Sequence, residues 1–464
     1  MVIFDSVKKE KVLFEPIKER QATLYVCGPT VYDDAHLGHA RSAISFDLLR
    51  RVLEASGYKT TLIRNVTDID DKIINKAKQT GKSIQDIAEF YEKRYLEDMA
   101  ALLVREPDIA PKVSESMDAI EAMIQTLIDK KYAYKISNGD IYFDTSKDTN
   151  YGTVSKKISD ESMSRVTHTD EKKNQKDFAL WKACTEDGSC FASPLGKGRP
   201  GWHIECSAMI EEYGLKDAPY SIDIHGGGAD LLFPHHENEA AQSRCATNHE
   251  LAKYWMHNGF VQIDGEKMSK SLGNSFFLKD ALKVYDGEIL RFYLAGIHYR
   301  SDFNFNEEDL LASKKRLDKL YRLKKRALFD TQSHPNESFI KPFLEALQDD
   351  INISKALSII DEMIAKANEQ LDLNPKDKEL KKVIGANLIF IQELLGFGAK
   401  ESAQYFQLGV SEEDKKQIEA LIQERLEAKS AKDFTKADTL RDTLAKMGIS
   451  IMDSSEGTLW ERAL

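Results

Sequence analysis

Two short polar motifs, far apart in the chain, constrain its fold more than any other feature. His36-Leu37-Gly38-His39 follows a strand-like run at residues 23–26 and precedes a helix-like run at residues 40–55. Lys267-Met268-Ser269-Lys270-Ser271 comes much later, and such a five-residue string is expected by chance in on the order of one in ten thousand chains of this length. The order of strand, histidine turn and helix predicts the first unit of an open α/β sheet.

The residue types of both motifs suit a reaction at the α-phosphate of ATP. Attack by a carboxylate builds negative charge on the phosphate oxygens and on the departing pyrophosphate, so catalysis is mostly positioning and charge stabilisation. His36 and His39 share one face of the helix start, beside N–H groups that favour an anion. Gly38 leaves room for an adenine ring near the backbone. We therefore predict catalytic roles for His36, His39, Lys267 and Lys270, and ATP contacts from Gly38 and Lys270.

For the histidine motif alone, a capped helix start with surface histidines remains an alternative. The lysine motif alone could be a solvated polar loop. The sequence contains neither a phosphate-binding Gly-x-x-x-x-Gly-Lys-Ser/Thr loop nor the dinucleotide-binding Gly-x-Gly-x-x-Gly pattern. The sequence therefore excludes P-loop nucleotide-binding proteins and proteins with the dinucleotide-binding fingerprint.

The strand, histidine turn and helix, together with the lysine motif, resemble the class I aminoacyl-tRNA synthetases. Longer strings resemble the cysteinyl-tRNA synthetase family in particular, from the N-terminus through the lysine motif and more weakly beyond it. These strings are CGPTVY at 27–32, NVTDIDDK at 65–72, GWHIECS at 201–207, HGGGAD at 225–230 and FPHHENE at 233–239.

The resemblance implies one zinc ion in the amino-acid pocket, held by two thiolates, an imidazole and a carboxylate, a donor set that zinc accepts. Two of the ligands are four residues apart, on one face if a helix begins after Pro234. His236 is expected to point elsewhere. Without the resemblance, buried structural thiols are the better interpretation of the two cysteines, because the spacing matches no zinc finger. The four predicted ligands are Cys27, Cys206, His235 and Glu239.

The resemblance also implies the residues that contact the amino acid and the adenosine. Asp230 would pair with the α-ammonium group, and Trp202 would form a wall of the pocket. Blander roles exist for each residue: a core aromatic, a strand end, a turn or a loop glycine. The predicted substrate contacts are Thr67, Trp202, His225 and Asp230, and the predicted ATP contacts include Gly226 and Gly227.

Composition is that of a globular protein of about three domains, with 464 residues, 42% hydrophobic and 30% charged. The N-terminus lacks the pattern of a signal peptide, and no apolar run reaches the length of a membrane span. Cys184, Cys190 and Cys245 have no metal-ligand spacing and are interpreted as ordinary thiols of a reducing compartment. We expect a cytoplasmic location, and by resemblance a monomer.

The predicted fold is α/β: a Rossmann-like nucleotide-binding catalytic domain split by an insertion, followed by a mostly helical C-terminal anticodon-binding region. An Asn138-Gly139 turn predicts a hairpin over residues 134–143 within the insertion. The expected divisions are catalytic halves at 1–110 and 201–301, an insertion at 111–200, a helical bundle at 302–400 and an anticodon-recognition domain at 401–464.

The C-terminal part contains a basic amphipathic stretch at residues 314–326. The net charge of −11 means that the surface as a whole does not attract RNA. The stretch is either a local RNA-binding strip or a solvated helix face, and Trp460 either stacks on a base or packs in a core. We expect a fragment that ends near Asp330 to keep the amino-acid chemistry.

The predicted function is ATP-dependent activation of L-cysteine and its transfer to tRNA-Cys, with Mg²⁺-bound ATP as substrate. One alternative is a relative that ligates cysteine to an amino-sugar with the same two sites. The long helical C-terminal part argues against it. The other alternative is a catalytically silent zinc- and RNA-binding protein, which the intact histidine and lysine motifs disfavour.

Overall fold

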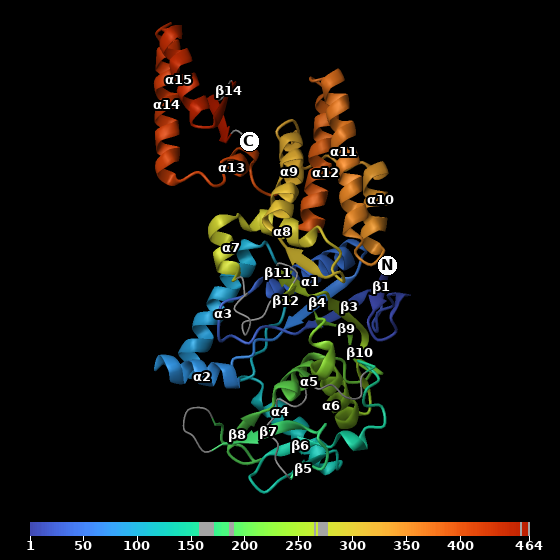
Figure 1. Cartoon of the computed structure of the whole chain (residues 1–464). Helices are drawn as coiled ribbons and strands as arrows, with labels where there is room; N and C mark the ends of the chain where they lie inside the picture. The colour runs from blue at the N-terminus through green and yellow to red at the C-terminus, as the bar shows by residue number, and fades with distance from the viewer. Residues whose placement is uncertain (157–170, 185–189, 264–265, 268–276, 455–456, 463–464) are drawn as a thin grey trace.

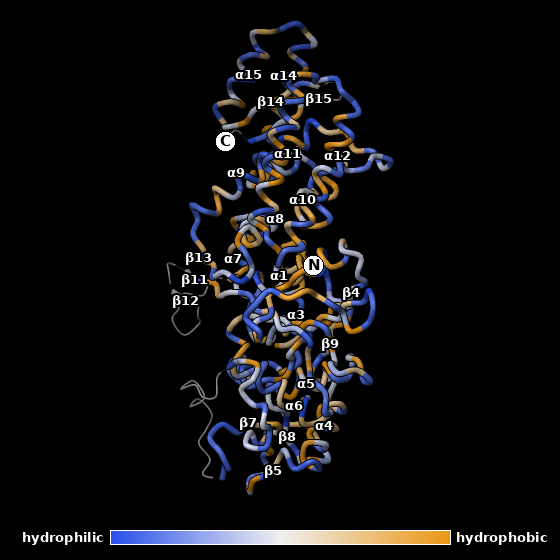
Figure 2. The backbone as a smooth tube through the Cα atoms, turned by 90° about the vertical axis from the view of Figure 1, so that its right-hand side faces the viewer, coloured by the Kyte–Doolittle hydropathy of each residue, from blue (hydrophilic) through white to orange (hydrophobic). Residues whose placement is uncertain are grey.

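The structure is a computed structural model that describes residues 1–156, 171–184, 190–263, 266–267, 277–454 and 457–462. The molecule is an elongated column with a parallel sheet at its middle. The insertion lies at one end and the helical C-terminal part at the other (Figures 1 and 2). Two views at right angles agree on this order along the long axis.

Four parallel strands form the central sheet, in the order β10-β9-β3-β4. Because the chain runs from β3 to the adjacent β4 and later returns to the opposite side of β3, the order reverses between β3 and β9. Open α/β sheets bind ligands beside such a reversal. The predicted Rossmann-like fold is confirmed. The strands are β3 (Gln21–Val26), β4 (Lys59–Arg64), β9 (Tyr220–Gly228) and β10 (Glu250–Asn258).

Helix α1 (Leu37–Ala55) connects β3 to β4 and covers one face of the sheet. Ile44, Leu48 and Val52 are buried at helical spacing, as the periodicity predicts. Gly57, with φ of +89°, follows the helix and lets the chain turn back into β4.

The insertion builds a separate antiparallel sheet in the order β5-β6-β7-β8, preceded by α4 (Met117–Asp129). The predicted hairpin is confirmed, with Gly139 at φ of +96° in its turn. Cys184 and Cys190 form a disulfide, so the interpretation of these two residues as ordinary thiols is wrong for this structure. The strands are β5 (Ala133–Lys135), β6 (Ile141–Phe143), β7 (Phe178–Ala183) and β8 (Gly198–Pro200).

Helices α5 (Trp202–Tyr213) and α6 (Glu237–Thr247) join the insertion to the other face of the central sheet. Smaller elements complete this region. They are β1 (Val2–Asp5), β2 (Glu10–Leu13), α2 (Asp71–Thr80), α3 (Ile84–Ala101), η1 (Thr145–Lys147), η3 (Leu232–His236), β11 (Val261–Ile263), β12 (Glu266–Lys267), α7 (Leu278–Val284), α8 (Gly287–Ala295) and β13 (Phe303–Phe305).

The helical bundle shares one hydrophobic core with α1 and α8. A buried ion network reinforces the junction: Arg291 and Arg51 both bind the carboxylate of Asp47, at 2.5 and 2.8 Å. A fragment ending near Asp330 would expose part of this core. Its retention of the amino-acid chemistry stays a prediction of the sequence. The bundle consists of α9 (Glu307–Lys324), α10 (Glu337–Gln348), α11 (Ile353–Leu373), α12 (Lys378–Leu395) and α13 (Ser402–Phe406).

The last unit stands apart from α10–α12 in Figure 1 and has a small core of its own. Trp460 is 6% exposed and packs in that core with Ile418, Ile422 and Leu444. Between the two roles left open by the sequence, the structure therefore assigns Trp460 to packing. The elements are α14 (Glu412–Ser430), α15 (Phe434–Lys446), β14 (Ile449–Ser454) and β15 (Gly457–Arg462).

Many cations of the basic stretch at 314–326 are paired within the protein. Lys314 binds Asp318, Arg316 binds Asp361, Lys325 binds Glu461 and Arg326 binds Asp372. The positive strip is therefore weaker than the sequence indicates. Among the described helices, each is either too short or too polar to cross a bilayer.

Candidate active site

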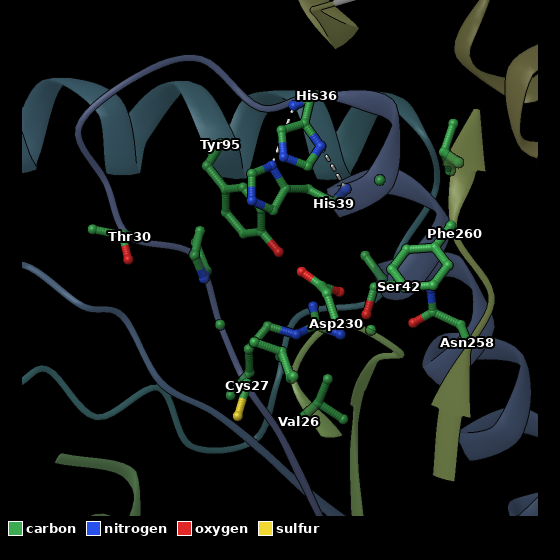
Figure 3. Close-up of a pocket in the computed structure, with 18 of the residues that line it drawn as sticks. Val26, Cys27, Thr30, His36, His39, Ser42, Tyr95, Asp230, Asn258 and Phe260 are labelled. Carbon is green, nitrogen blue, oxygen red and sulfur yellow. Dashed lines mark hydrogen bonds between the residues drawn. The ribbon is translucent and has the colours of Figure 1, made fainter. Parts of the chain in front are cut away.

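A cavity of about 320 Å³ lies at the carboxyl ends of the four central strands. Val26 lines it from β3, Cys27 from directly after β3, Arg64 from β4 and Asn258 from β10. The start of α1 forms its opposite wall, with His36 and His39 across the cavity from Cys27 (Figure 3). The cavity thus occupies the ligand site expected for this sheet topology.

His36 and His39 cap helix α1 reciprocally. The His39 N–H donates to Nδ1 of His36 at 3.3 Å, and the His36 N–H donates to Nδ1 of His39 at 3.2 Å. The rings stack with their centroids 3.7 Å apart. Because each Nδ1 accepts a backbone N–H, each neutral ring carries its proton on Nε2. In each neutral imidazole, Nε2 is therefore the donor, while the backbone N–H groups at the start of α1 have Nδ1 acceptors.

Two segments, α3 and α7, hold the histidine turn in place. The Leu278 N–H donates to the carbonyl of Ala35 at 2.8 Å, and the carboxylate of Asp34 binds Arg94 at 2.6 Å and Lys279 at 2.5 Å. Arg94 belongs to α3, and Lys279 belongs to α7. The turn is thus anchored to α3 and to the chain that follows the lysine motif.

The four predicted metal ligands converge. One donor atom from each of them lies within 4.8 Å of the others, close enough to hold one metal ion. Nε2 of His235 is 2.7 Å from Oε1 of Glu239, as expected for residues four apart in sequence. The four are Cys27, Cys206, His235 and Glu239.

A second possible set shares two of these ligands and adds His225 and His236. The prediction that His236 points elsewhere is wrong: its Nε2 lies 3.4 Å from Sγ of Cys27. Nδ1 of His236 contacts Nε2 of His257 at 2.8 Å. The first set has two sulfur donors and suits a borderline-soft cation better.

Neighbouring side chains orient the ligands. Nδ1 of His235 lies 2.8 Å from Nδ1 of His203, so Nε2 is left facing the cluster. Oε2 of Glu239 lies 2.5 Å from Nε2 of His225, so Oε1 faces the cluster. Partners of this kind fix the ring orientation and basicity of metal ligands.

The protons of the cluster are distributed by burial and by its own charges. Burial alone would raise the pKa of Glu239, but His235 and His225 hold it well below its usual range. Burial opposes protonation of His235, yet Glu239 and Cys206 raise its pKa to about 10. A hydrogen bond with Cys27 lowers the pKa of Cys206 to about 6, whereas burial raises the pKa of Cys27. An ionised carboxylate and an acidic thiol are the donors that a divalent cation needs.

Of the four predicted substrate residues, two line the cavity and two are buried outside its lining. Trp202 and Asp230 line the cavity. Trp202 is 41% exposed and stacks on His235 at 4.0 Å, and the carboxylate of Asp230 points into the cavity in Figure 3. Thr67 and His225 are buried outside the cavity lining; Thr67 accepts a hydrogen bond from Asn65, and His225 contacts Glu239.

The predicted ATP-binding glycines also differ. Gly38 lines the cavity, whereas Gly226 and Gly227 are buried beside it and do not belong to its lining. A Cβ at Gly226 would lie 2.3 Å from the ring of Phe46 in α1, so this glycine permits close packing of helix and sheet.

The lysine motif can be placed only in part. The backbone of Lys267 belongs to strand β12, which pairs with β11. Its side chain and residues 268–271, Lys270 included, lie outside the described residues.

Sequence reasoning missed Arg64 and Asn258 among the cavity residues. Each stands at the carboxyl end of a parallel strand of the sheet, Arg64 in β4 and Asn258 in β10. A polar residue at the end of an otherwise buried strand was the available signal.

Comparison with known proteins gives the family. A model of the class I (C) tRNA synthetase catalytic domain matches residues 13–315, the DALR domain matches 342–400, and the cysteinyl-tRNA ligase anticodon-binding domain matches 413–460. A cysteine–tRNA ligase of Sulfurovum sp. is 66% identical, and one of Nitratiruptor sp. is 64% identical, each over the full length of both chains. The chain belongs to the cysteine–tRNA ligase family. A member from Helicobacter pylori strain P12 is 61% identical, again over both full lengths.

Solved structures support the fold of this family member. Two methionyl-tRNA synthetase structures from Mycobacterium tuberculosis superpose with TM-scores of 0.58 and 0.60 at 14% and 13% identity. They cover 87% and 85% of this chain, and 94% and 95% of their own. The class I synthetase fold predicted from the sequence is confirmed.

Proposed function

We propose that this chain is a cysteine–tRNA ligase: it activates L-cysteine with Mg²⁺-bound ATP to cysteinyl-adenylate and transfers the cysteinyl group to tRNA-Cys. The observation that carries the proposal is 66% identity to a cysteine–tRNA ligase over the full length of both chains. The cavity at the strand ends supports it, with His36 and His39 on one side and Cys27 on the other. Cys27 belongs to the thiol cluster, which consists of Cys27, Cys206, His235 and Glu239.

The histidine pair would act on ATP. Each ring accepts a backbone N–H at Nδ1, so a neutral ring carries its proton on Nε2, a donor that a phosphate oxygen could accept. The positive N-terminal end of α1 adds to this attraction. Such preorganised donors stabilise the charge that develops during attack on the α-phosphate. Lys267 and Lys270 are proposed as the further cations on the phosphates.

Cysteine would lie between Asp230, Trp202 and the thiol cluster. Asp230 is proposed to bind the ammonium group and Trp202 to wall the pocket. We propose zinc as the metal ion, held by Cys27, Cys206 and the other two ligands of the first set, because two sulfur donors favour it. When bound, zinc supplies a borderline-soft Lewis acid that favours a thiol over the hydroxyl group of serine.

RNA recognition is proposed for residues 302–464. The matches of the DALR domain and of the anticodon-binding domain both fall within this part. Cytoplasmic location and a monomeric state stay predictions of the sequence.

Two assays test the function. Cysteine-dependent exchange of pyrophosphate into ATP tests activation, and a protein without exchange would be the silent binder. Charging of tRNA-Cys with cysteine tests transfer, and a protein that charges an amino-sugar instead of tRNA would be the ligase relative. Serine in place of cysteine is the control for specificity in both assays.

A further inference from the structure

Arg64 is a buried cation that belongs neither to the thiol cluster nor to the histidine and lysine motifs. It ends strand β4, and its residue is 5% exposed. It lines the cavity together with Cys27 and Asp230. Among the residues that the structure describes, none lies within hydrogen-bond distance of its buried terminal nitrogen Nη2, and none forms an ion pair with its guanidinium.

Burying a guanidinium without a partner is costly, since the charge gives up its hydration and receives nothing in return. Other buried arginines of this protein avoid that cost. Arg291 donates to Asp47 and to the carbonyls of Leu395 and Leu102, and Arg51 donates to Asp47 and to two carbonyls. An unpaired arginine in a cavity wall therefore points to a ligand that brings the negative charge.

Asp230 offers the opposite charge in the same cavity. Its residue is exposed, and it forms no ion pair with Arg64 or with any other described residue. Arg64 is the last residue of β4, and Asp230 lies two residues beyond the end of β9. Strand β3 separates β4 from β9 in the sheet. The cavity lining thus holds a cation and an anion that are not paired with each other, as the binding of a zwitterionic ligand requires.

We propose that Arg64 binds the carboxylate of the amino-acid substrate. The proposal rests on the proposed function and adds a third contact to it: Asp230 for the ammonium group, the thiol cluster at Cys27 for the side chain, and Arg64 for the carboxylate. A guanidinium matches a carboxylate with two parallel N–H donors, which fixes orientation as well as charge.

That orientation serves the reaction. One carboxylate oxygen forms a bond to the α-phosphorus, the bond from the α-phosphorus to the bridging oxygen breaks, and pyrophosphate leaves with the electron pair. No proton needs to move in this step. Arg64 holds the substrate carboxylate so that one carboxylate oxygen faces the α-phosphate. Holding the two reacting groups in this geometry lowers the activation barrier.

The test compares L-cysteine with cysteamine, the same aminothiol without the carboxylate. In the full-length protein, pyrophosphate exchange gives KM for cysteine and for ATP, and inhibition of exchange gives Ki for cysteamine. Arg64→Gln is expected to raise KM for cysteine about 10- to 100-fold, as for loss of a hydrogen-bonded charged partner. Ki for cysteamine and KM for ATP are expected to change less than about threefold. Arg64→Lys is expected to restore part of the cysteine affinity.

Two controls separate this role from a structural one. Arg105 lines a neighbouring cavity that Arg64 also borders, and it is paired with Glu54. Arg105→Gln is therefore expected to leave KM for cysteine, KM for ATP and Ki for cysteamine unchanged. Arg64→Gln removes an unpaired buried charge, so its melting temperature is expected to equal or exceed that of the parent.

Three outcomes would overturn the proposal. They are an equal loss of cysteine and cysteamine affinity, a larger change in KM for ATP than for cysteine, or unchanged KM for cysteine in Arg64→Gln. If the parent itself lacks cysteine-dependent exchange, the proposed function fails instead.

Discussion

Replacing His36 by serine should separate the two roles of the histidine pair. In the structure His36 is the N-cap residue of α1 and also lines the cavity. Serine is a favoured N-cap residue whose hydroxyl can accept the His39 N–H, but it provides no imidazole. His36→Ala removes both functions. The pair of variants therefore divides the effect of the side chain between helix capping and chemistry.

The two effects differ in size. Loss of a side-chain cap costs about 1 kcal/mol of stability, whereas loss of one preorganised donor lowers the rate about 10²-fold, which corresponds to about 2.7 kcal/mol in the barrier. We expect His36→Ser to stay within about 0.5 kcal/mol of the parental stability and His36→Ala to lose about 1 kcal/mol. Both variants should lose about 10²-fold in adenylation.

Denaturant unfolding gives the stability difference, and single-turnover formation of cysteinyl-adenylate gives the rate. Equilibrium binding of ATP provides the control, since a contact that strengthens in the transition state should change affinity less than rate. His39→Gln is the matched variant at the other end of the capping box, where glutamine keeps the reciprocal cap. If His36→Ser formed adenylate at the parental rate while His36→Ala did not, His36 would be a helix cap only.

Further expectations concern the metal cluster, the C-terminal unit and a buried carboxyl. Cys206→Ser should raise KM for cysteine more than KM for ATP and lower the zinc content, measured by elemental analysis; parental enzyme that is active without zinc would refute this. A chain ending at Leu408 keeps the shared core and should retain cysteine-dependent exchange but charge tRNA-Cys at least about tenfold less efficiently, because it lacks the matched anticodon-binding domain; undiminished charging would place recognition elsewhere. Burial raises the pKa of Asp98 to about 6, so the folded chain holds this proton more tightly than the unfolded chain. The protonated Asp98 carboxyl therefore adds to the free energy of unfolding below about pH 4, and this contribution is lost as pH rises through 6. Asp98→Asn should therefore stabilise the fold at pH 7, by about 1 kcal/mol after allowance for solvent screening. Melting curves between pH 4 and 7 that show no such gain would contradict the raised pKa of Asp98.

The sequence by itself determined the local elements and the residues whose chemistry depends on short spacing. The strand, the histidine turn and α1 follow from a change of hydrophobic period within residues 21–55, and His235 faces Glu239 because four residues make about one helical turn. These features depend on neighbours along the chain. They could be predicted because backbone geometry converts spacing directly into direction.

Only the tertiary structure decided which distant side chains meet. His225 contacts Glu239 because β9 and α6 pack together, and Gly226 is excluded from the cavity lining by its place against Phe46 of α1. Trp460 is buried by α14 and β14, and the sequence pattern around Trp460 does not predict this burial. Arg64 could be identified as a candidate binding residue only because the sheet brings it and Asp230 into the lining of one cavity. The physical reason is that burial and pairing depend on packing between elements. A sequence pattern specifies which face of a helix or strand is apolar, but not which other element packs against that face.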